Sequence, residues 1–325
     1  MTRLGYQIPS FTYPDTGPAE LFDIIARQAK EADSSGFDTL LVMDHFYQLP
    51  HLGEPERFML ECYSLLSALA RETTSMRLSA LVTGNTYRNP AILAKTVTTL
   101  DIVSNGRAQL GIGAGWYELE HNSFGIEFGT FTDRFEKLEE ALQIILPMLN
   151  GDKATFAGKH YNMVEAMNSP APVRHIPVMI GGGGERKTLR MAAQYADESN
   201  IIADLADMPR KLDALAEHLA NHGRSRQDIT VSYQRTVCIA PTMEEAQADL
   251  NAYLRLRGMD PDTLPEEFRA FIAGRFIIGD PDTVGEKLTN ELALGIDGFT
   301  INMPASGHIP GRVTLLGEVA SKVVG

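Results

Sequence analysis

Short apolar segments alternate with amphipathic segments along the whole chain. The apolar segments have the length of β-strands, and the segments between them repeat apolar residues with the period of a helix. Eight strands are predicted, at 3–8, 37–43, 76–83, 106–113, 177–181, 198–202, 229–240 and 297–303. Several predicted helices end on glycine, as helix C-caps do: Gly36, Gly106 and Gly151. Asn89–Pro90 has the pattern of an N-cap followed by proline in the first helical turn.

A strand followed by a helix, repeated eight times, predicts parallel strands closed into a (β/α)8 TIM-type barrel of the α/β class. The strands are almost continuously apolar, as expected when both faces of a sheet are covered. A minimal barrel takes about 250 residues, whereas this chain has 325. We expect residues 1–325 to form a single domain. The residues beyond the length of a minimal barrel are expected in insertions in the loops that follow strands, at about 44–58, 114–130, 150–176 and 256–280.

The net charge narrows the possible binding partners, and the cysteine content narrows the possible cellular compartment. The formal net charge of −13 argues against a nucleic-acid or membrane-surface binder, because such partners require a basic face. Cys62 and Cys238 fit buried apolar positions and form no disulfide framework, which suits a reducing compartment. The first residues have no apolar signal segment, and no apolar run has the length of a transmembrane helix. We therefore expect a soluble, cytoplasmic protein.

Four consecutive glycines follow the fifth predicted strand and precede a helical segment that starts at Glu185. These are Gly181, Gly182, Gly183 and Gly184. Main-chain N–H groups at the start of a helix, with no Cβ to block them, suit a phosphate or another anion. Arg186 and Lys187 could add positive charge. The alternative is a tight turn in which glycine is needed only for its backbone geometry.

Other candidate residues lie where ligands bind in a TIM barrel, at the C-terminal ends of the strands. His45, which follows Asp44 at the end of the second predicted strand, is a candidate proton donor or hydrogen-bond partner. The segment GIGAGW at 111–116 does not match the dinucleotide fingerprint G-x-G-x-x-G. Its alternating glycines suggest a strand end that something flat approaches closely, or close packing alone. Two further histidines are expected to complement a helix dipole rather than to bind a metal: His218 and His222.

Four segments together resemble the bacterial-luciferase-like superfamily, and more narrowly its branch of coenzyme F420-dependent oxidoreductases. They are FDTLLVMDHF, LVTGNTYRNPAILAKTVTTLDIVSNGRAQLGIGAGWYELEHNSFGIEFG, IPVMIGGGGERKTLRMAAQYAD and IIGDPDTVGEKLTNELALGIDGFTINMP. They occur in the order in which the family has them, and the resemblance runs over essentially the whole chain. It implies a TIM-type barrel that holds one flavin or deazaflavin at the strand ends.

The resemblance also implies roles for individual residues. A non-prolyl cis peptide behind the cofactor ring would fall at Ala80–Leu81, and Thr83 would contact the ring edge. Asp44 matches a cofactor-contacting aspartate, and His45 matches the active-site histidine. The remaining matches are the strand-four contact and the phosphate loop: Ala114, Gly115, Gly181, Gly182, Gly183 and Gly184.

One position departs from the sugar-phosphate dehydrogenases of the family. They carry a glutamate acid/base directly after the Gly-x-Gly of the fourth strand, where this chain has Trp116. The departure puts a glucose-6-phosphate dehydrogenase role in doubt and favours a more apolar or aromatic substrate. Trp116 and Tyr117 could line the pocket for such a substrate, although an aromatic residue in a loop is often only a packing plug.

Three functions are therefore compared. The first is an F420-dependent oxidoreductase that transfers a hydride between the deazaflavin and a small organic molecule. The second is an FMN-dependent two-component monooxygenase that uses reduced flavin and O2, with a separate reductase. The third is a flavin-binding protein without catalysis. A cationic groove beyond the glycine run would favour F420, whose tail is acidic. The resemblance also implies a homodimer or homotetramer.

Overall fold

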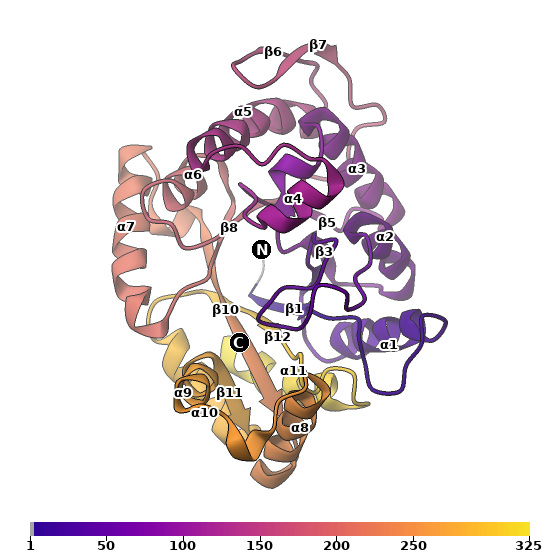
Figure 1. Ribbon diagram of the computed structural model, residues 1–325. Coiled ribbons are helices and arrows are strands. Elements are labelled where there is room, and N and C mark those ends of the chain that lie inside the picture. The colour runs from indigo at the N-terminus through magenta and orange to yellow at the C-terminus, as the bar shows by residue number, and fades with distance from the viewer. Residues whose placement is uncertain (1–2) are drawn as a thin grey trace.

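The computed structural model describes residues 3–325, and a closed barrel of parallel strands lies at its centre (Figure 1). The eight barrel strands of this described part are, in order around the ring, β1 (Leu4–Ile8), β2 (Thr39–Val42), β3 (Arg77–Ala80), β5 (Ala108–Gly113), β8 (Val178–Gly181), β9 (Glu198–Ile201), β10 (Thr230–Ile239) and β12 (Gly298–Asn302). Strands β12 and β1 pair in parallel and close the ring. All eight predicted strands and the predicted barrel are confirmed.

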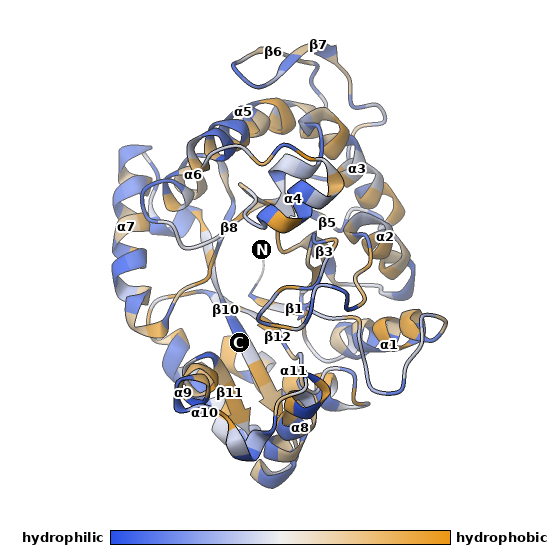
Figure 2. Ribbon diagram, viewed as in Figure 1, coloured by the Kyte–Doolittle hydropathy of each residue, from blue (hydrophilic) through white to orange (hydrophobic). Residues whose placement is uncertain are grey.

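Helices surround the barrel and turn their apolar sides toward it (Figure 2). One follows each barrel strand: α1 (Leu21–Ser34), α2 (Cys62–Glu72), α3 (Pro90–Val103), α5 (Phe131–Leu149), α6 (Thr188–Tyr195), α7 (Met208–Asn221), α10 (Pro281–Leu292) and α11 (Arg312–Val324). Across residues 3–325, none of the helices combines the length and the apolar character that crossing a membrane would require.

The predicted helix ends are present. Asn89 caps α3, because its side-chain oxygen accepts the N–H groups of Ala91 and Ile92 at 3.0 and 3.4 Å. The three predicted glycine caps adopt positive φ angles, which side chains with a Cβ rarely adopt: Gly36 (99°), Gly106 (84°) and Gly151 (87°).

Further elements lie between the barrel units. They are β4 (Thr83–Gly84), α4 (Glu118–Phe124), β6 (Ala154–Ala157), β7 (Asn162–Ala166), α8 (Met243–Leu256), α9 (Glu266–Arg275), β11 (Phe276–Gly279) and 3-10 turns at Asn85–Tyr87, Leu205–Asp207, Arg226–Asp228 and Pro261–Thr263. Thus α4, the β6–β7 hairpin and α9 lie within three of the expected insertions. The hairpin projects from the body beside α5, and α4 lies over the barrel in Figure 1.

Strand β11 was not predicted from the sequence, because its four residues fall in the range 256–280 that was expected to be an insertion. It pairs in parallel with the last residues of β10, Thr236–Ile239. The earlier residues of β10 pair with β9 and β12 instead. The long strand β10 therefore extends past the end of β9. Along this extension, β11 pairs with the edge of β10 that β9 pairs with earlier.

Candidate active site at the barrel mouth

The predicted site residues gather at one end of the barrel. All barrel strands are parallel, so the loops that follow β2, β5 and β8 leave at the same mouth. These loops carry His45, Trp116 and the glycine run at 181–184. Helix α4 belongs to the loop after β5 and lies over this mouth (Figure 1).

His45 is held by a carboxylate that the sequence did not reveal as a site residue. Its Nδ1 lies 2.8 Å from Oε2 of Glu120, on α4. The Glu120 side chain is fully buried, whereas 12% of the His45 side chain is exposed. Burial would raise the pKa of Glu120, but the hydrogen bonds from His45, from the Tyr87 hydroxyl and from the Tyr47 N–H outweigh it and lower this pKa. Glu120 is therefore a buried, charged acceptor for the histidine.

The second carboxylate of the site, Asp44, forms an ion pair with Arg88 and accepts a main-chain hydrogen bond. Arg88 donates to both of its oxygens, at 2.6 and 3.0 Å, and the Gly84 N–H donates to Oδ2 at 3.2 Å. Arg88 also binds Glu61 at 2.7 Å. The Asp44 side chain therefore anchors the start of the loop that carries His45, and a cofactor contact by Asp44 stays a prediction.

Two aromatic residues that were candidates for a substrate pocket flank His45, and their role in substrate binding stays a prediction. The ring centres of Trp116 and Tyr117 lie 5.8 and 5.9 Å from that of His45, each nearly perpendicular to it. The two aromatic rings stack on each other at 5.2 Å. Tyr117 is buried, but 56% of Trp116 is exposed, so Trp116 has a free apolar surface next to the histidine.

The predicted cis bond lies one residue later than expected. It is Leu81–Val82, not Ala80–Leu81. The ladder with β2 continues through the Leu81 N–H, which donates to Val42 O at 2.8 Å, so the break between β3 and β4 follows Leu81. Thr83 is fully buried, and its hydroxyl lies 2.6 Å from that of Tyr63.

Packing within the chain accounts for the alternating glycines at 111, 113 and 115, as one of the two interpretations held. A Cβ at Gly111 would lie 2.0 Å from Ala80 O, and one at Gly113 would lie 2.9 Å from a Val82 methyl group. A Cβ at Gly115 would lie 2.7 Å from Thr86 Oγ1. The end of β3 and the residues that follow it, up to Thr86, therefore fill the space that side chains at these three positions would need.

The glycine run at 181–184 is partly exposed and faces the same mouth. The Gly182 N–H donates to Asn200 O at 2.9 Å. The N–H groups of Gly183 and Gly184 donate no hydrogen bond within the described chain. A Cβ at Gly183 would lie 2.4 Å from Ile202 O. Two amides of this partly exposed run therefore have no partner within the described chain, and the close approach of Ile202 requires glycine at 183.

The charges around this run include residues that were not predicted. Helix α6 begins at Thr188, three residues later than expected, and residues 185–187 form a turn. Lys211, on α7, donates to Gly183 O at 2.6 Å. Lys187 lies over the rings of two phenylalanines of α5. His218 binds the carbonyl oxygen of Glu185 at 2.8 Å, which gives it a structural contact.

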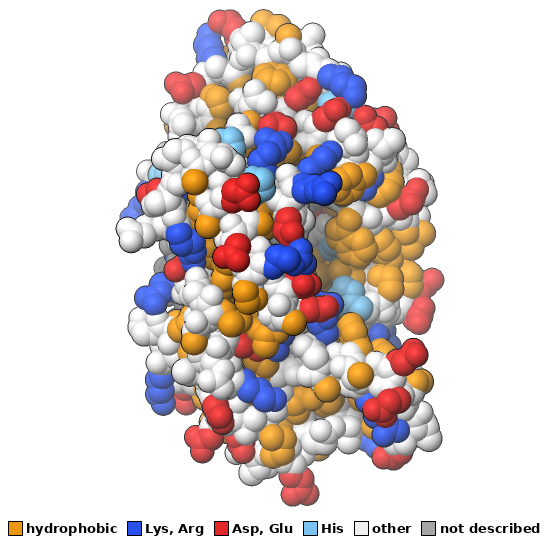
Figure 3. Space-filling model, turned by 90° about the vertical axis from the view of Figure 1, so that its left-hand side faces the viewer, with side chains coloured by type: hydrophobic (Ala, Val, Ile, Leu, Met, Phe, Trp, Pro, Cys, Tyr) orange, Lys and Arg blue, Asp and Glu red, His pale blue; other side chains and the backbone are white. Residues whose placement is uncertain are grey.

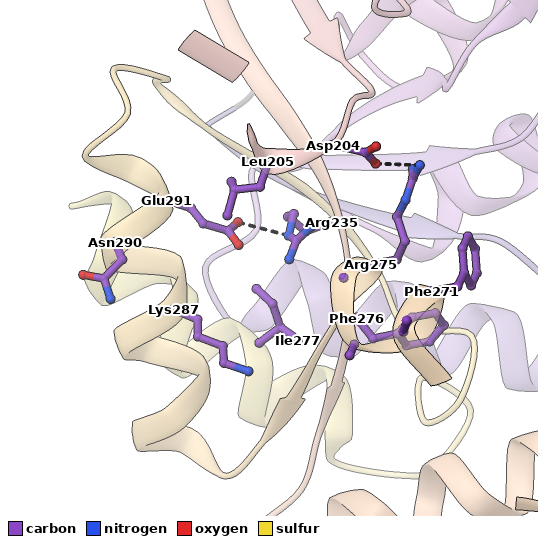
Figure 4. Close-up of a pocket in the computed structure, with 13 residues that line it drawn as sticks. Asp204, Leu205, Arg235, Phe271, Arg275, Phe276, Ile277, Lys287, Asn290 and Glu291 are labelled. Carbon is purple, nitrogen blue, oxygen red and sulfur yellow. Dashed lines mark ion pairs between the residues drawn. The ribbon is translucent and has the colours of Figure 1, made fainter. Parts of the chain in front are cut away.

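Two cavities lie beside these residues, and Tyr87, which donates to Glu120, lines one of them. The larger, about 670 Å³, lies between α9, α10, β10, the start of β11 and the loop after β9 (Figure 4). Its wall contains a buried ion pair between Arg235 and Glu291 at 3.0 Å and a second pair between Arg275 and Asp204 at 2.7 Å. The smaller, about 480 Å³, is lined by residues that include Tyr87, Lys137 and His160. None of these residues was singled out from the sequence.

Positive and negative side chains are not segregated into separate patches on the face drawn in Figure 3. Acidic and basic side chains are interspersed there, with apolar patches between them. Such a face lacks the clustered cations that bind a nucleic acid.

Comparisons with known proteins agree with the fold. Residues 2–298 match the family of luciferase-like monooxygenases. An F420-dependent glucose-6-phosphate dehydrogenase of Nocardia farcinica (strain IFM 10152) is 30% identical over 318 residues, which cover 90% of this chain and 89% of the relative.

Two solved structures share the fold. An F420-dependent secondary alcohol dehydrogenase in complex with an F420-acetone adduct is 20% identical, with a TM-score of 0.80 and coverage of 100% of this chain and 99% of that one. The oxygenating constituent of 3,6-diketocamphane monooxygenase of Pseudomonas putida, in complex with FMN, is 19% identical, with a TM-score of 0.78 and coverage of 99% and 98%. The chain belongs to the luciferase-like monooxygenase family.

Proposed function

We propose that this protein is a coenzyme F420-dependent oxidoreductase, which passes a hydride between the deazaflavin and an organic substrate. A relative and a structural neighbour are F420-dependent by their names. When bound, F420 supplies the redox chemistry at C5 of its ring. The observation that carries the proposal is the pair of open amides at Gly183 and Gly184, at the same mouth as His45.

The glycine run would hold the phosphate of the cofactor. Open N–H groups without a Cβ suit an anion, and Lys211 brings a cation to the same loop. Cations outnumber acids next to the run, although the whole chain is acidic: Arg186, Lys187, Arg210 and Lys211 against Glu185 and Asp207. This local excess of positive charge suits the acidic tail of F420 better than FMN, which has no such tail.

His45 would bind or release the proton that accompanies the hydride. Its Nδ1 lies against the charged Glu120, so in the neutral ring Nδ1 carries the hydrogen and donates it. The lone pair then lies on Nε2, which is left for the substrate.

The substrate would be apolar or aromatic rather than a sugar phosphate. The exposed face of Trp116 gives an apolar wall beside His45. The resemblance assigns to sugar-phosphate dehydrogenases a glutamate directly after a Gly-x-Gly in this segment. Here Ala114 follows Gly111–Gly113 and Trp116 follows Gly113–Gly115, so neither position holds a glutamate. Burial of an aromatic ring against this wall would contribute binding energy and exclude water from the site.

Titration of the apoprotein with F420 and with FMN tests the proposal. We expect F420 to bind more tightly, and to lose affinity at high salt because its tail contacts lysine and arginine. Tighter binding of FMN would support the alternative, a two-component monooxygenase that uses O2 and flavin reduced by a separate enzyme. The FMN-bound neighbour motivates this alternative. Binding of neither cofactor would contradict the role of the glycine run.

A flavin-binding protein without catalysis is less consistent with the site, because the His45–Glu120 pair and the exposed Trp116 lie beside an open loop. Turnover with any substrate would exclude it. The proposal also includes a single domain, a cytoplasmic location and a homodimer or homotetramer. Both cysteines are free and buried, as a reducing compartment allows.

A further inference from the structure

The larger cavity, between α9 and α10, lies outside the barrel wall. Neighbouring residues of a strand point to opposite sides, and Gln234 points inward, where its Nε2 donates to Oε1 of Gln7 at 3.0 Å. Arg235 therefore points outward, toward Glu291 on α10 (Figure 4). We call this cavity the lateral pocket, whose wall includes Leu205, Arg235, Phe271, Ile277, Lys287 and Glu291.

The guanidinium of Arg235 lies in the inner wall of the lateral pocket and has few hydrogen bonds. Only 7% of its side chain is exposed. Its Nε lies 3.0 Å from Oε2 of Glu291, but neither atom is aligned for a hydrogen bond. Its Nη1 reaches the Tyr233 hydroxyl only at 3.5 Å, and Nη2 has no partner among the described residues. A buried charge with unused donors is costly, so this group favours an acceptor that enters the pocket from outside.

The charges in the wall indicate which acceptor fits. The lateral pocket is lined by three cations and two acids, namely Arg235, Arg275 and Lys287 against Asp204 and Glu291. Arg275 and Asp204 pair with each other at 2.7 Å. Lys287 is exposed and lies one turn before Glu291 on α10. The pocket therefore has an excess of one positive charge, in a chain whose net charge is −13, and a single negative charge would neutralise it.

Most of the remaining wall is apolar. Leu205, Phe271, Phe276 and Ile277 line it, and 42% of Phe271 is exposed. The volume of about 670 Å³ lies within the range of about 300–1,000 Å³ that is usual for sites of small molecules. Such sites combine apolar walls with a few polar groups that orient the ligand. A planar guanidinium binds a carboxylate through two parallel hydrogen bonds. These features together fit a carboxylate that carries an apolar body.

We propose that the lateral pocket binds a small monocarboxylate with an apolar or aromatic body, at a site separate from the barrel mouth. Arg235 binds the carboxylate through the donors that no described residue uses. Lys287 adds positive charge at the edge of the pocket, and Phe271 and Ile277 pack against the apolar body. The inference concerns a second ligand and does not depend on which cofactor the mouth holds.

Isothermal titration calorimetry of the full-length apoprotein with 1-naphthoate tests this site. We expect saturable binding to the wild type. The neutral analogue 1-naphthalenemethanol should bind about tenfold more weakly or worse, because a guanidinium binds a charged acceptor more strongly than a neutral one. Acetate, which has the charge but not the apolar body, should give no measurable heat. Binding of the alcohol as tight as that of naphthoate would overturn the assignment of a carboxylate.

Variants of the wall locate the bound naphthoate. The double variant with Arg235→Gln and Glu291→Gln removes both charges of the ion pair together, so no buried charge is left without a partner. It should bind naphthoate about tenfold more weakly or worse. Lys287→Ala, at an exposed position, should lower the affinity about twofold to fivefold. Lys322→Ala, at an exposed lysine of α11, is the matched control and should leave the affinity unchanged.

Trp116→Ala separates the lateral pocket from the barrel mouth. Trp116 is exposed beside His45, so naphthoate held at the mouth would lose affinity in this variant, whereas naphthoate in the lateral pocket should keep it. Thermal unfolding without ligand checks that each variant is folded. Should the double variant not fold, Lys287→Ala and Lys322→Ala decide, and equal affinities would overturn the proposal. Absence of binding to the wild type, binding that survives the double variant, or binding that Trp116→Ala abolishes would also overturn it.

Discussion

Nδ1 of His45 lies 2.8 Å from Oε2 of Glu120, although 75 residues separate the two in the chain. Glu120 also accepts the N–H groups of Phe46 and Tyr47, so one carboxylate fixes both the imidazole and the loop that carries it. Glu120 is thus a positioning residue, and His45 is the candidate for proton transfer. The predictions that follow separate these roles.

Replacing Glu120 with glutamine should lower kcat by about 10- to 100-fold, less than the roughly 10²- to 10⁴-fold expected for loss of an acid–base group. Glutamine keeps the size of the side chain but removes the negative charge that the His45 N–H faces. Steady-state kinetics and the 15N chemical shifts of His45 check this together, because the shifts report which ring nitrogen carries the hydrogen. Glu118→Gln, two residues away and exposed, is the control. Unchanged shifts in Glu120→Gln would remove the tautomer role.

Replacing His45 with alanine should lower kcat by about 10²- to 10⁴-fold. The dissociation constant of the cofactor should change little, because the glycine run that holds the phosphate is intact. Equilibrium titration and single-turnover kinetics measure the two effects separately. His175→Ala, at an exposed histidine paired with Asp197, is the control. Unchanged turnover in His45→Ala would remove this residue from the mechanism.

Replacing Gly183 with alanine should weaken cofactor binding by about tenfold or more, which corresponds to roughly 1.4 kcal/mol. The added Cβ would lie 2.4 Å from Ile202 O, so the loop must move and its open amides with it. Gly285→Ala is the control, since a Cβ there meets only a Val319 methyl group at an ordinary 3.4 Å. Equal affinities of the two variants would contradict the phosphate role.

Asp33 should make folding stability depend on pH in the acid range. Burial raises the pKa of Asp33, but hydrogen bonds from Ser75, Thr74 and Met76 outweigh it and lower the pKa to about 2. The folded-state value lies below the unfolded value of about 3.9. The stabilisation is therefore complete above the unfolded value and disappears as the pH falls through about 2.

Asp33→Asn should lower the free energy of unfolding by about 1 kcal/mol at neutral pH, a figure reduced because the carboxylate is partly exposed. The difference from the wild type should vanish toward pH 2. Urea unfolding of both proteins across this range measures it. Asp213→Asn, at an exposed position on α7, should cost little at any pH. A pH-independent deficit in Asp33→Asn would show that the charge is not the cause.

Much of the fold follows from patterns within short segments. All eight barrel strands, the cap at Asn89 and the glycine C-caps were predicted, because strand and helix periods and cap geometry depend on residues that are near in sequence. The exception, β11, is a four-residue apolar run whose pairing partner is the end of β10. Nothing within those four residues distinguishes a strand from part of a buried helix.

The sequence by itself determined the barrel and the side of it on which the candidate residues lie, because parallel strands place their C-terminal ends together. Only the tertiary structure decided which side chains meet there. It paired His45 with Glu120 and Asp44 with Arg88, brought Lys211 to the glycine loop, and showed that the glycines of β5 make room for the end of β3 and the residue Val82 that follows it. Such contacts join residues that are far apart in sequence, and they form only when the ring closes and sets the distances between its loops.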